Sequence, residues 1–219
     1  MLEKRTLQRN LRLLVWLMIS TIIVTISLAW IFFPEEYLFF QYFISRLGRI
    51  ETHSNLSNLT SMIIFITGFS LVATLSLIIS VLYYTHPTLE FNFLKGSLTV
   101  LLAIGAVGIA IPADHPTLAT LHNIGAFFFI FTFGIYNFVA QLLLCVIKHD
   151  SKVENQSIDF YIDLVIAIIV FVVFLLYTII AILDMMADII IPWLTTELTQ
   201  KIVLIVDCVS VFFLDIPDM

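Results

Sequence analysis

The chain has 219 residues, of which 61% are hydrophobic and only 12% are charged, and its mean hydropathy is +1.08. A soluble domain is typically about 45–50% apolar and about 25% charged, so this composition excludes an ordinary soluble domain and indicates an all-α integral membrane protein. The 10 Lys and Arg residues are scattered, which excludes a nucleic-acid-binding surface, and the net charge of −6 has meaning only once each charge is assigned to a side of the membrane.

Six apolar stretches are long enough to cross a bilayer, which takes about 20 residues of helix. They are residues 11–33, 59–84, 96–112, 121–147, 158–183 and 190–214. The first follows a basic start, but it is longer than a signal peptide's apolar region and no small-residue cleavage site follows it, so we expect a retained span. The last is interrupted by Pro192, Glu197 and Lys201. Without repeats or linkers, the sequence predicts one domain over residues 1–219, a bundle of six transmembrane helices.

The basic residues favour one orientation in the cell membrane. With the N-terminus inside, seven of the 10 fall in inner segments and three in outer ones. Because inner segments are enriched in Lys and Arg, this bias predicts a cytoplasmic N-terminus, and six spans return the C-terminus to the same side. The inner residues are Lys4, Arg5, Arg9, Arg12, Lys95, Lys148 and Lys152, and the outer ones are Arg46, Arg49 and Lys201.

The connection between the first two stretches is too apolar for a plain solvent loop. Residues 37–47 (YLFFQYFISRL) carry aromatic side chains on most of one helical face. This pattern favours an amphipathic helix in the membrane interface, with its aromatic rings at headgroup depth. An ordinary loop that packs over the mouth of the bundle is the alternative.

The third stretch is rich in small residues. Ala103, Gly105, Ala106, Gly108 and Ala110 are spaced along one short helix. Small residues let helix backbones approach closely in lipid, so we expect this helix to be central in the bundle.

Ionisable residues gather at the outer ends of the predicted helices and in the outer loops. Two interpretations stay open: an outward-facing polar pocket, or charges that cap and snorkel at helix ends. Since unpaired charges at headgroup depth are costly, we expect five residues from different elements to converge on one outer site. These are Arg46, Asp114, His122, Glu197 and Lys201.

Asp114 and His122 are the residues of the outer end that could contribute to a metal site. Asp114 lies in a turn restricted by Pro112 and Pro116, where it can accept N–H groups at the start of the next helix. His122 lies about two turns further on. A zinc site needs three or four ligands and no H-x-x-x-H pair is present, so capping and a hydrogen-bonded histidine are favoured, and no cofactor is expected.

Asp207 differs from the rim residues because it lies about 9 Å deeper than Lys201 along the last stretch. An intramembrane carboxylate must pair, become neutral or line a wet cavity, and Ser210 and Thr67 are candidate partners. Cys145 and Cys208 lie in apolar stretches and are expected to act as small hydrophobic residues. Asn55 and Asn58 each begin a glycosylation sequon, and the sequence leaves their modification open.

Two segments resemble a known family. They are FPEEYLFFQYFISRLGRIETHSNLSN and GAVGIAIPADHPTLATLHNIGA, which are similar to the "ISxLG … N" and "G…P-x-D … H-x-x-x-A" patterns of the domain of unknown function 998 family of prokaryotic membrane proteins. The matching positions are Ile44, Ser45, Leu47, Gly48, Asn58, Gly108, Pro112, Asp114, His122 and Ala126. In LTTELTQKI, Glu197 and Lys201 stand where that family usually has Gly and Arg. The resemblance implies a six-span fold and its topology. It does not imply any particular activity.

The first motif also resembles the alkaline-ceramidase superfamily, whose members use a Ser–Asp–three-His zinc site. This sequence lacks the late histidine pair of that site. The leading hypothesis is therefore a non-enzymatic protein whose outer polar rim binds membrane lipids, a membrane-protein partner or a second copy of the chain. The alternatives are a metal-dependent lipid hydrolase that uses Asp114 and His122, and a proton-coupled transporter that uses Asp207. The absence of an inverted repeat weakens the transporter hypothesis.

Overall fold

The computed structural model describes residues 2–150, 158–187 and 193–213, and the regular elements of that part are helices. They are α1 (Leu2–Ile31), α2 (Leu59–Thr85), α3 (Asn92–Ile109), α4 (Ala119–Asp150), α5 (Ile158–Ala187) and α6 (Thr196–Phe213), with a short 3₁₀ helix, η1 (Ile44–Gly48), between α1 and α2. The prediction of an all-α fold is confirmed.

Five of the described helices, α1 to α5, are long and apolar enough to cross a membrane. They correspond to the first five predicted stretches. α6 has 18 residues, as α3 does, but it carries Glu197, Lys201 and Asp207. The predicted sixth stretch, 190–214, starts and ends outside the described residues, and within them its helix begins only at Thr196.

Prolines account for most helix ends at one end of the bundle. Pro34 follows α1, and Pro112 and Pro116 lie in the turn between α3 and α4. Proline cannot donate a backbone hydrogen bond and restricts the residue before it, so helices stop ahead of it. At the opposite end, Pro87 follows α2, and Phe91 has a left-handed backbone (φ 53°) immediately before α3.

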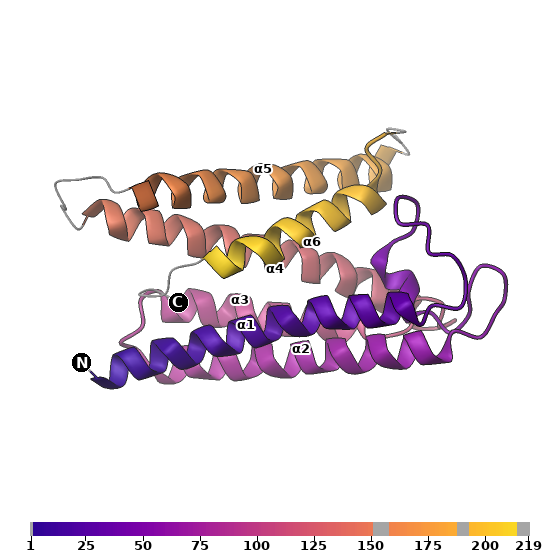
Figure 1. The fold of residues 1–219 in the computed structure, drawn as a ribbon, viewed down its shortest axis with the longest axis horizontal. Helices are drawn as coiled ribbons and strands as arrows, with labels where there is room; N and C mark the ends of the chain where they lie inside the picture. The colour runs from indigo at the N-terminus through magenta and orange to yellow at the C-terminus, as the bar shows by residue number, and fades with distance from the viewer. Residues whose placement is uncertain (1, 151–157, 188–192, 214–219) are drawn as a thin grey trace.

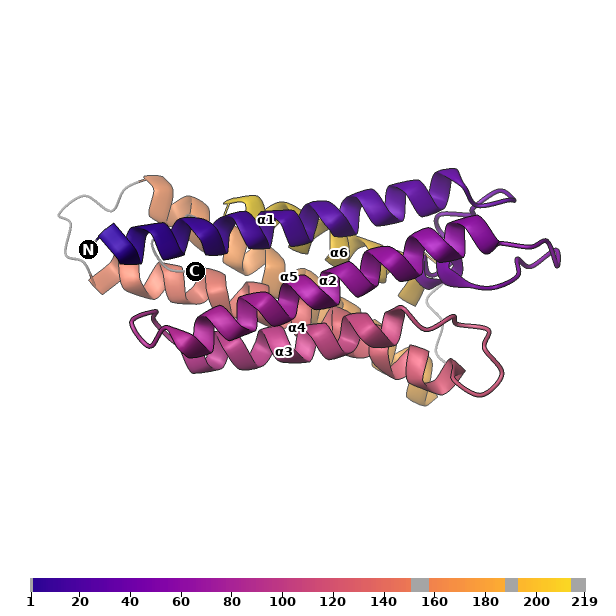
Figure 2. The same cartoon turned by 90° about the horizontal axis from the view of Figure 1, so that it is seen from below.

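The helices lie lengthwise and alternate in direction along the chain (Figures 1 and 2). α1, α2 and α3 form one side, α5 lies on the other, and α6 crosses obliquely between α5 and α1. The connections 32–58 and 110–118 and the start of α6 lie together at one end, here called the loop end. The start of α1 lies at the opposite end.

α3 packs between α2 and α4, as its small residues predict. The contact with α4 is closest at Gly108 and Gly125, where a Cβ built on Gly108 would lie 2.5 Å from the Gly125 Cα. A Cβ built on Gly105 would likewise lie 2.6 Å from the Phe129 backbone nitrogen. Any side chain at these positions would separate the two backbones, so glycine is required for this helix pair.

The outward faces of the helices are covered with large hydrophobic side chains. Each described helix contributes exposed ones, among them Leu13, Ile63, Ile104, Ile124, Val172 and Ile205. Since a soluble protein rarely exposes continuous apolar faces, this surface fits a membrane-embedded protein.

The helix expected over residues 37–47 is wrong for most of its length. A turn at Leu38–Tyr42, closed by hydrogen bonds from the N–H groups of Gln41 and Tyr42 to the Leu38 carbonyl, replaces it. Only η1 is helical. Tyr37 and Leu47 are buried against the bundle while Phe40 remains exposed. The segment is therefore a loop folded back over the bundle, because its aromatic residues find partners on α1 and α6 and not along one helical face.

Candidate functional site

The loop end is built around hydrogen bonds from α2 to the segment that precedes it. The Asn58 side chain is buried, and its Nδ2 donates to the carbonyl oxygens of Leu47 at 3.1 Å and Arg49 at 2.9 Å. The Ser61 hydroxyl lies 2.8 Å from the carbonyl oxygens of both Ala29 and Leu47. Its single hydrogen can serve one of them at a time. Together these bonds fix the end of η1 to α1 and α2.

Asp114 joins the second outer connection to the first. Its carboxylate accepts the N–H of Ile50 at 2.9 and 3.0 Å and the N–H of Glu51 at 3.0 Å, and it lies 3.8 Å from the Arg49 Nε. The expected role at the start of α4 is therefore wrong: the carboxylate holds the loop before α2. His122 lies near the start of α4 and binds the connection between α3 and α4. Its Nδ1 is 2.6 Å from the Ile111 carbonyl oxygen.

The segment 37–47 is held from the other side by α6. The Gln200 Oε1 accepts the N–H of Ile44 at 3.2 Å, and the Lys201 ammonium donates to the Tyr42 carbonyl and, at 3.1 Å, to the Glu197 carbonyl. The Tyr37 hydroxyl donates to the same Tyr42 carbonyl at 3.1 Å. Burial raises the pKa of the Tyr37 phenol, which keeps it a donor.

Aromatic rings surround the buried Lys201 ammonium. Its Nζ lies 5.1 Å from the Phe39 ring centroid and 5.9 Å from that of Tyr37. Trp30 packs against both rings, at 5.8 and 5.7 Å. No carboxylate in the described part of the chain forms an ion pair with Lys201. Cation–π contacts, two carbonyls and the charge of Glu197, one turn earlier on α6, therefore stabilise this ammonium.

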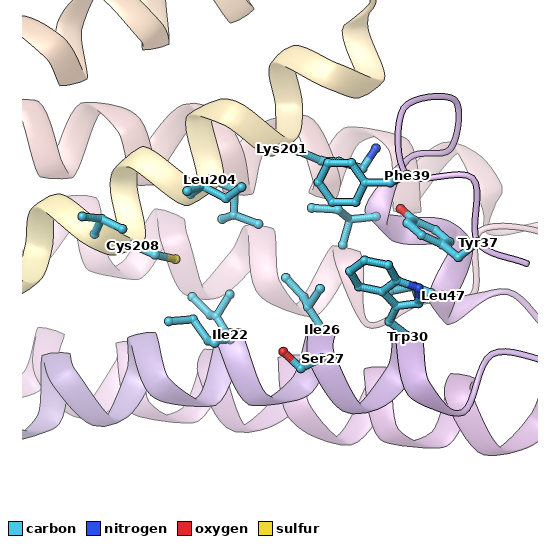
Figure 3. Close-up of a pocket in the computed structure, with 14 residues that line it drawn as sticks. Ile22, Ile26, Ser27, Trp30, Tyr37, Phe39, Leu47, Lys201, Leu204 and Cys208 are labelled. Atoms are coloured by element: carbon cyan, nitrogen blue, oxygen red, sulfur yellow. The ribbon is translucent and has the colours of Figure 1, made fainter.

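Beside these rings, on the side away from the loop end, an apolar groove runs between α1 and α6 (Figure 3). We call it the α1–α6 groove; its volume is about 320 Å³. Figure 3 shows Ile22, Ile26 and Ser27 on α1 facing Leu204 and Cys208 on α6 across it. The other lining residues are Ile23, Trp30, Tyr37, Phe39, Ile44, Leu47, Lys201, Ile205 and Val209. The groove is thus open to the apolar flank of the bundle and closed at the loop end by Lys201 and its aromatic neighbours.

The five predicted rim residues form two groups. The first group is Arg46, Glu197 and Lys201. The Arg46 guanidinium lies 4.0 Å from the centroid of the Tyr42 ring, and the carbonyl of the same tyrosine accepts a hydrogen bond from Lys201. Glu197 lies one turn before Lys201 on α6. Asp114 and His122 belong to the turn between α3 and α4 and interact electrostatically with each other and with Arg49. The loop 42–51 connects the two groups. No direct contact between them is present among the described residues.

No three His, Cys, Asp or Glu side chains within the described ranges are arranged to hold a metal ion. The candidates Asp114 and His122 have other bonds, as given above. Of the sequon residues, Asn58 has its amide nitrogen buried and bonded, whereas Asn55 is exposed at the tip of the loop.

The carboxylate of Asp207, which the sequence predicts to lie within the membrane, is found among polar residues of α4. The Asn137 Nδ2 donates to the Asp207 Oδ1 at 2.8 Å and to the Ser210 Oγ at 2.5 Å, and the Gln141 Nε2 donates to the Ser210 carbonyl at 3.2 Å. Of the two candidate partners of Asp207, Ser210 belongs to the same hydrogen-bonded group. Thr67 instead lines a depression between α1 and α2. Sequence reasoning missed Asn137 and Gln141, although two amides four residues apart in an apolar helix are a signal for them.

Comparisons with known proteins bring no match: no family model, no curated protein and no solved structure is similar to this chain at a significant level. The geometry of the two candidate regions, the α1–α6 groove and the surroundings of Asp207, therefore carries the functional argument.

Proposed function

We propose that this chain is a non-enzymatic multipass membrane protein that binds a membrane lipid in the α1–α6 groove, with an acyl chain along the groove and an anionic headgroup near Lys201. The single observation that carries the proposal is a buried ammonium at the closed end of an apolar groove, without an ion pair to any described residue. Lipid is the solvent of this surface, so a lipid chain is the natural occupant.

The apolar part of the groove supports an acyl chain. Its walls are aliphatic and aromatic, and a volume of about 320 Å³ lies in the range of small-molecule sites. Each methylene transferred from water would contribute about 0.8 kcal/mol, but in a bilayer the gain comes from packing alone. Affinity and selectivity must therefore come from the polar end.

The polar end supports an anionic headgroup. Two of the three ammonium hydrogens of Lys201 are used by carbonyl groups, which leaves one for a ligand. The Arg46 Nη1 is buried and has no hydrogen-bond partner in the described part of the chain. Buried unpaired donors and a buried charge are costly, and a phosphate would satisfy both. In this proposal Asp114 and His122 hold the loop that carries Arg46.

We further propose that α6 crosses the cell membrane as a sixth span and that both chain ends are cytoplasmic. An 18-residue helix is about 27 Å long, close to the thickness of the hydrocarbon core. The basic residues favour this orientation. Single cysteines introduced at Ser54 and Ser151 test it: an impermeant thiol reagent should label position 54 from outside and position 151 only after permeabilisation. The reverse pattern would contradict the orientation.

Native mass spectrometry of the detergent-solubilised protein tests lipid binding. Added phosphatidylglycerol should be retained in preference to phosphatidylcholine. Lys201→Met should remove that preference, because it keeps most of the apolar length of the side chain and deletes the charge. Ser27→Trp should fill the groove and reduce retention of both lipids. Ser20→Trp is the matched control, since it adds the same ring to α1 in the depression between α1 and α2.

The result also separates lipid binding from structural pairing. If Lys201→Met lowers the unfolding temperature but leaves the preference for phosphatidylglycerol unchanged, Lys201 only locks α6 to the loop and the proposal is wrong. Equal loss of lipid in Ser27→Trp and Ser20→Trp would likewise place the bound lipid outside the α1–α6 groove.

A further inference from the structure

Four buried polar side chains form a cluster between α4 and α6, outside the residues that line the α1–α6 groove. Asn137 and Gln141 lie one turn apart on α4, and Asp207 and Ser210 lie one turn apart on α6. All four are at least 96% buried. We call them the Asp207 cluster. Their hydrogen bonds join two helices that pack directly against each other.

The Asp207 cluster has more acceptors than donors. The two amide hydrogens of Asn137 are used on Asp207 Oδ1 and Ser210 Oγ, and the Ser210 hydroxyl donates to the Asp207 carbonyl at 3.1 Å. Gln141 spends one hydrogen on the Ser210 carbonyl. Three side-chain oxygens then remain buried without a hydrogen-bond partner: Asp207 Oδ2, Asn137 Oδ1 and Gln141 Oε1.

An ionised Asp207 would also carry an uncompensated charge. No Lys, Arg or His in the described part of the chain forms an ion pair with Asp207. Lys201, the nearest cation along α6, is bonded to Tyr42 and Glu197. A buried charge in a membrane protein is kept only where something of opposite charge or high polarity satisfies it.

We propose that the Asp207 cluster binds a monovalent alkali cation, with the carboxylate of Asp207 and the amide oxygens of Asn137 and Gln141 as its ligands. Hard cations take oxygen ligands of this kind, namely carboxylate, amide and hydroxyl groups. One positive charge beside one carboxylate leaves the site neutral, whereas a divalent ion would leave a net charge in a low-dielectric interior.

A proton alone satisfies the cluster less well than a cation does. A hydrogen on Asp207 Oδ2 turns that oxygen into a donor and pairs it with one amide oxygen. The second amide oxygen then receives no hydrogen bond from Asp207. The one amide hydrogen of the cluster that is not already used in a hydrogen bond belongs to Gln141. A cation that reached all three oxygens would satisfy them without a further donor and would leave the four existing donor bonds of Asn137, Ser210 and Gln141 in place.

Thermal unfolding of the full chain in detergent tests the proposal. NaCl, KCl and choline chloride are compared at equal ionic strength, so that general salt effects cancel. In the wild type, Na⁺ or K⁺ should raise the unfolding midpoint in a saturable manner relative to choline, because a ligand that binds only the folded state stabilises it. The shift should disappear in Asp207→Asn and shrink in Gln141→Leu. Ser76→Ala, which removes a buried hydroxyl on α2, should keep the full shift.

Direct binding of ²²Na⁺ to the same variants gives a second readout that does not depend on stability. One saturable site in the wild type and in Ser76→Ala, and none in Asp207→Asn, is the expected result. A wild type that responds identically to all three salts and binds no ²²Na⁺ would overturn the proposal without any variant. So would an Asp207→Asn protein that keeps the cation response. If Asp207→Asn does not fold, Gln141→Leu and the wild type decide.

Discussion

The carboxylate of Asp114 accepts the backbone N–H of Ile50 through both of its oxygens, at 2.9 and 3.0 Å, across 64 residues of sequence. It accepts the N–H of Glu51 as well. This relationship makes the turn between α3 and α4 the support of the loop before α2. The position of Arg46, and through Tyr42 that of Lys201, therefore depends on a residue that touches neither of them.

Replacing Asp114 with Ala should destabilise the loop by about 2 kcal/mol, because hydrogen bonds to a charged acceptor contribute about 1.5–3 kcal/mol. Limited proteolysis should cut faster within residues 49–57. Glu36→Ala is the control, since Glu36 is an exposed carboxylate close to the same loop. Equal protection of the wild type and the Asp114→Ala protein would contradict this role.

The two asparagines that begin the sequons, Asn55 and Asn58, should differ sharply in how much substitution by aspartate destabilises the protein. Asn58→Asp replaces a buried donor with an acceptor that faces the carbonyl oxygens of Leu47 and Arg49, so we expect a loss of at least about 2 kcal/mol. Asn55→Asp should be neutral, because Asn55 is exposed and its left-handed backbone (φ 57°) suits either residue. Unfolding midpoints in detergent compare them, and equal midpoints would refute the assigned role of Asn58.

Glu35 gives the loop a defined pH dependence. Burial raises its pKa, but hydrogen bonds from Ser54, His53 and Thr52 outweigh this and lower it below the ordinary value of 4.5. The stabilisation is therefore complete above pH 4.5 and is lost as the pH falls through the lower folded-state pKa. Hydrogen exchange at the amides of His53 and Ser54, corrected for the intrinsic rate, should accelerate in that range. Glu35→Gln should abolish the pH dependence.

Hydropathy was sufficient to predict α1 to α5, whereas the helix of the sixth stretch begins only at Thr196 within the described residues. Pro34, Pro87 and Pro112 lie just beyond helix ends, and the small residues of the third stretch predict a central helix, whose glycines meet α4. Periodicity failed at residues 37–47, because the aromatic residues there do not lie on one face of a helix. Tyr37 and Tyr42 instead pack on α1 and α6, and no local pattern encodes these distant contacts.

The candidate sites were predictable only in part. The sequence identifies Lys201 and Asp207 as charges in an apolar stretch, which predicts that each has a partner or a functional role. It does not identify their partners, because these are a main-chain carbonyl at Tyr42 and amides on α4. The convergence of Arg46, Asp114, His122, Glu197 and Lys201 stays a prediction, and the contacts described above join these residues through the loop 42–51.

Gly108→Ala should destabilise the α3–α4 pair by about 2 kcal/mol, the usual cost of overpacking. Its new methyl group would meet the Gly125 backbone, which cannot move without separating the helices. Gly96→Ala is the matched control, because its nearest neighbours are ring atoms of Tyr84 at 3.1 Å, which can shift. Since alanine favours a helix by about 1 kcal/mol over glycine, Gly96→Ala should be neutral or stabilising. Equal unfolding midpoints for the two variants would contradict the close α3–α4 contact.

His122 should act through its Nδ1 hydrogen and not as a metal ligand or a base. The Ile111 carbonyl can only accept, so the 2.6 Å bond requires a hydrogen on Nδ1, and Nε2 is buried without a partner among the described residues. Asparagine carries its amide nitrogen close to the place of Nδ1, whereas the glutamine amide reaches the place of Nε2. His122→Ala should therefore lose about 1 kcal/mol or more, His122→Asn should recover most of that loss and His122→Gln should not. Unfolding midpoints in detergent rank the three variants. Recovery by Gln and not by Asn would show that Nε2 is the functional atom and would restore a ligand or proton-transfer role for this histidine.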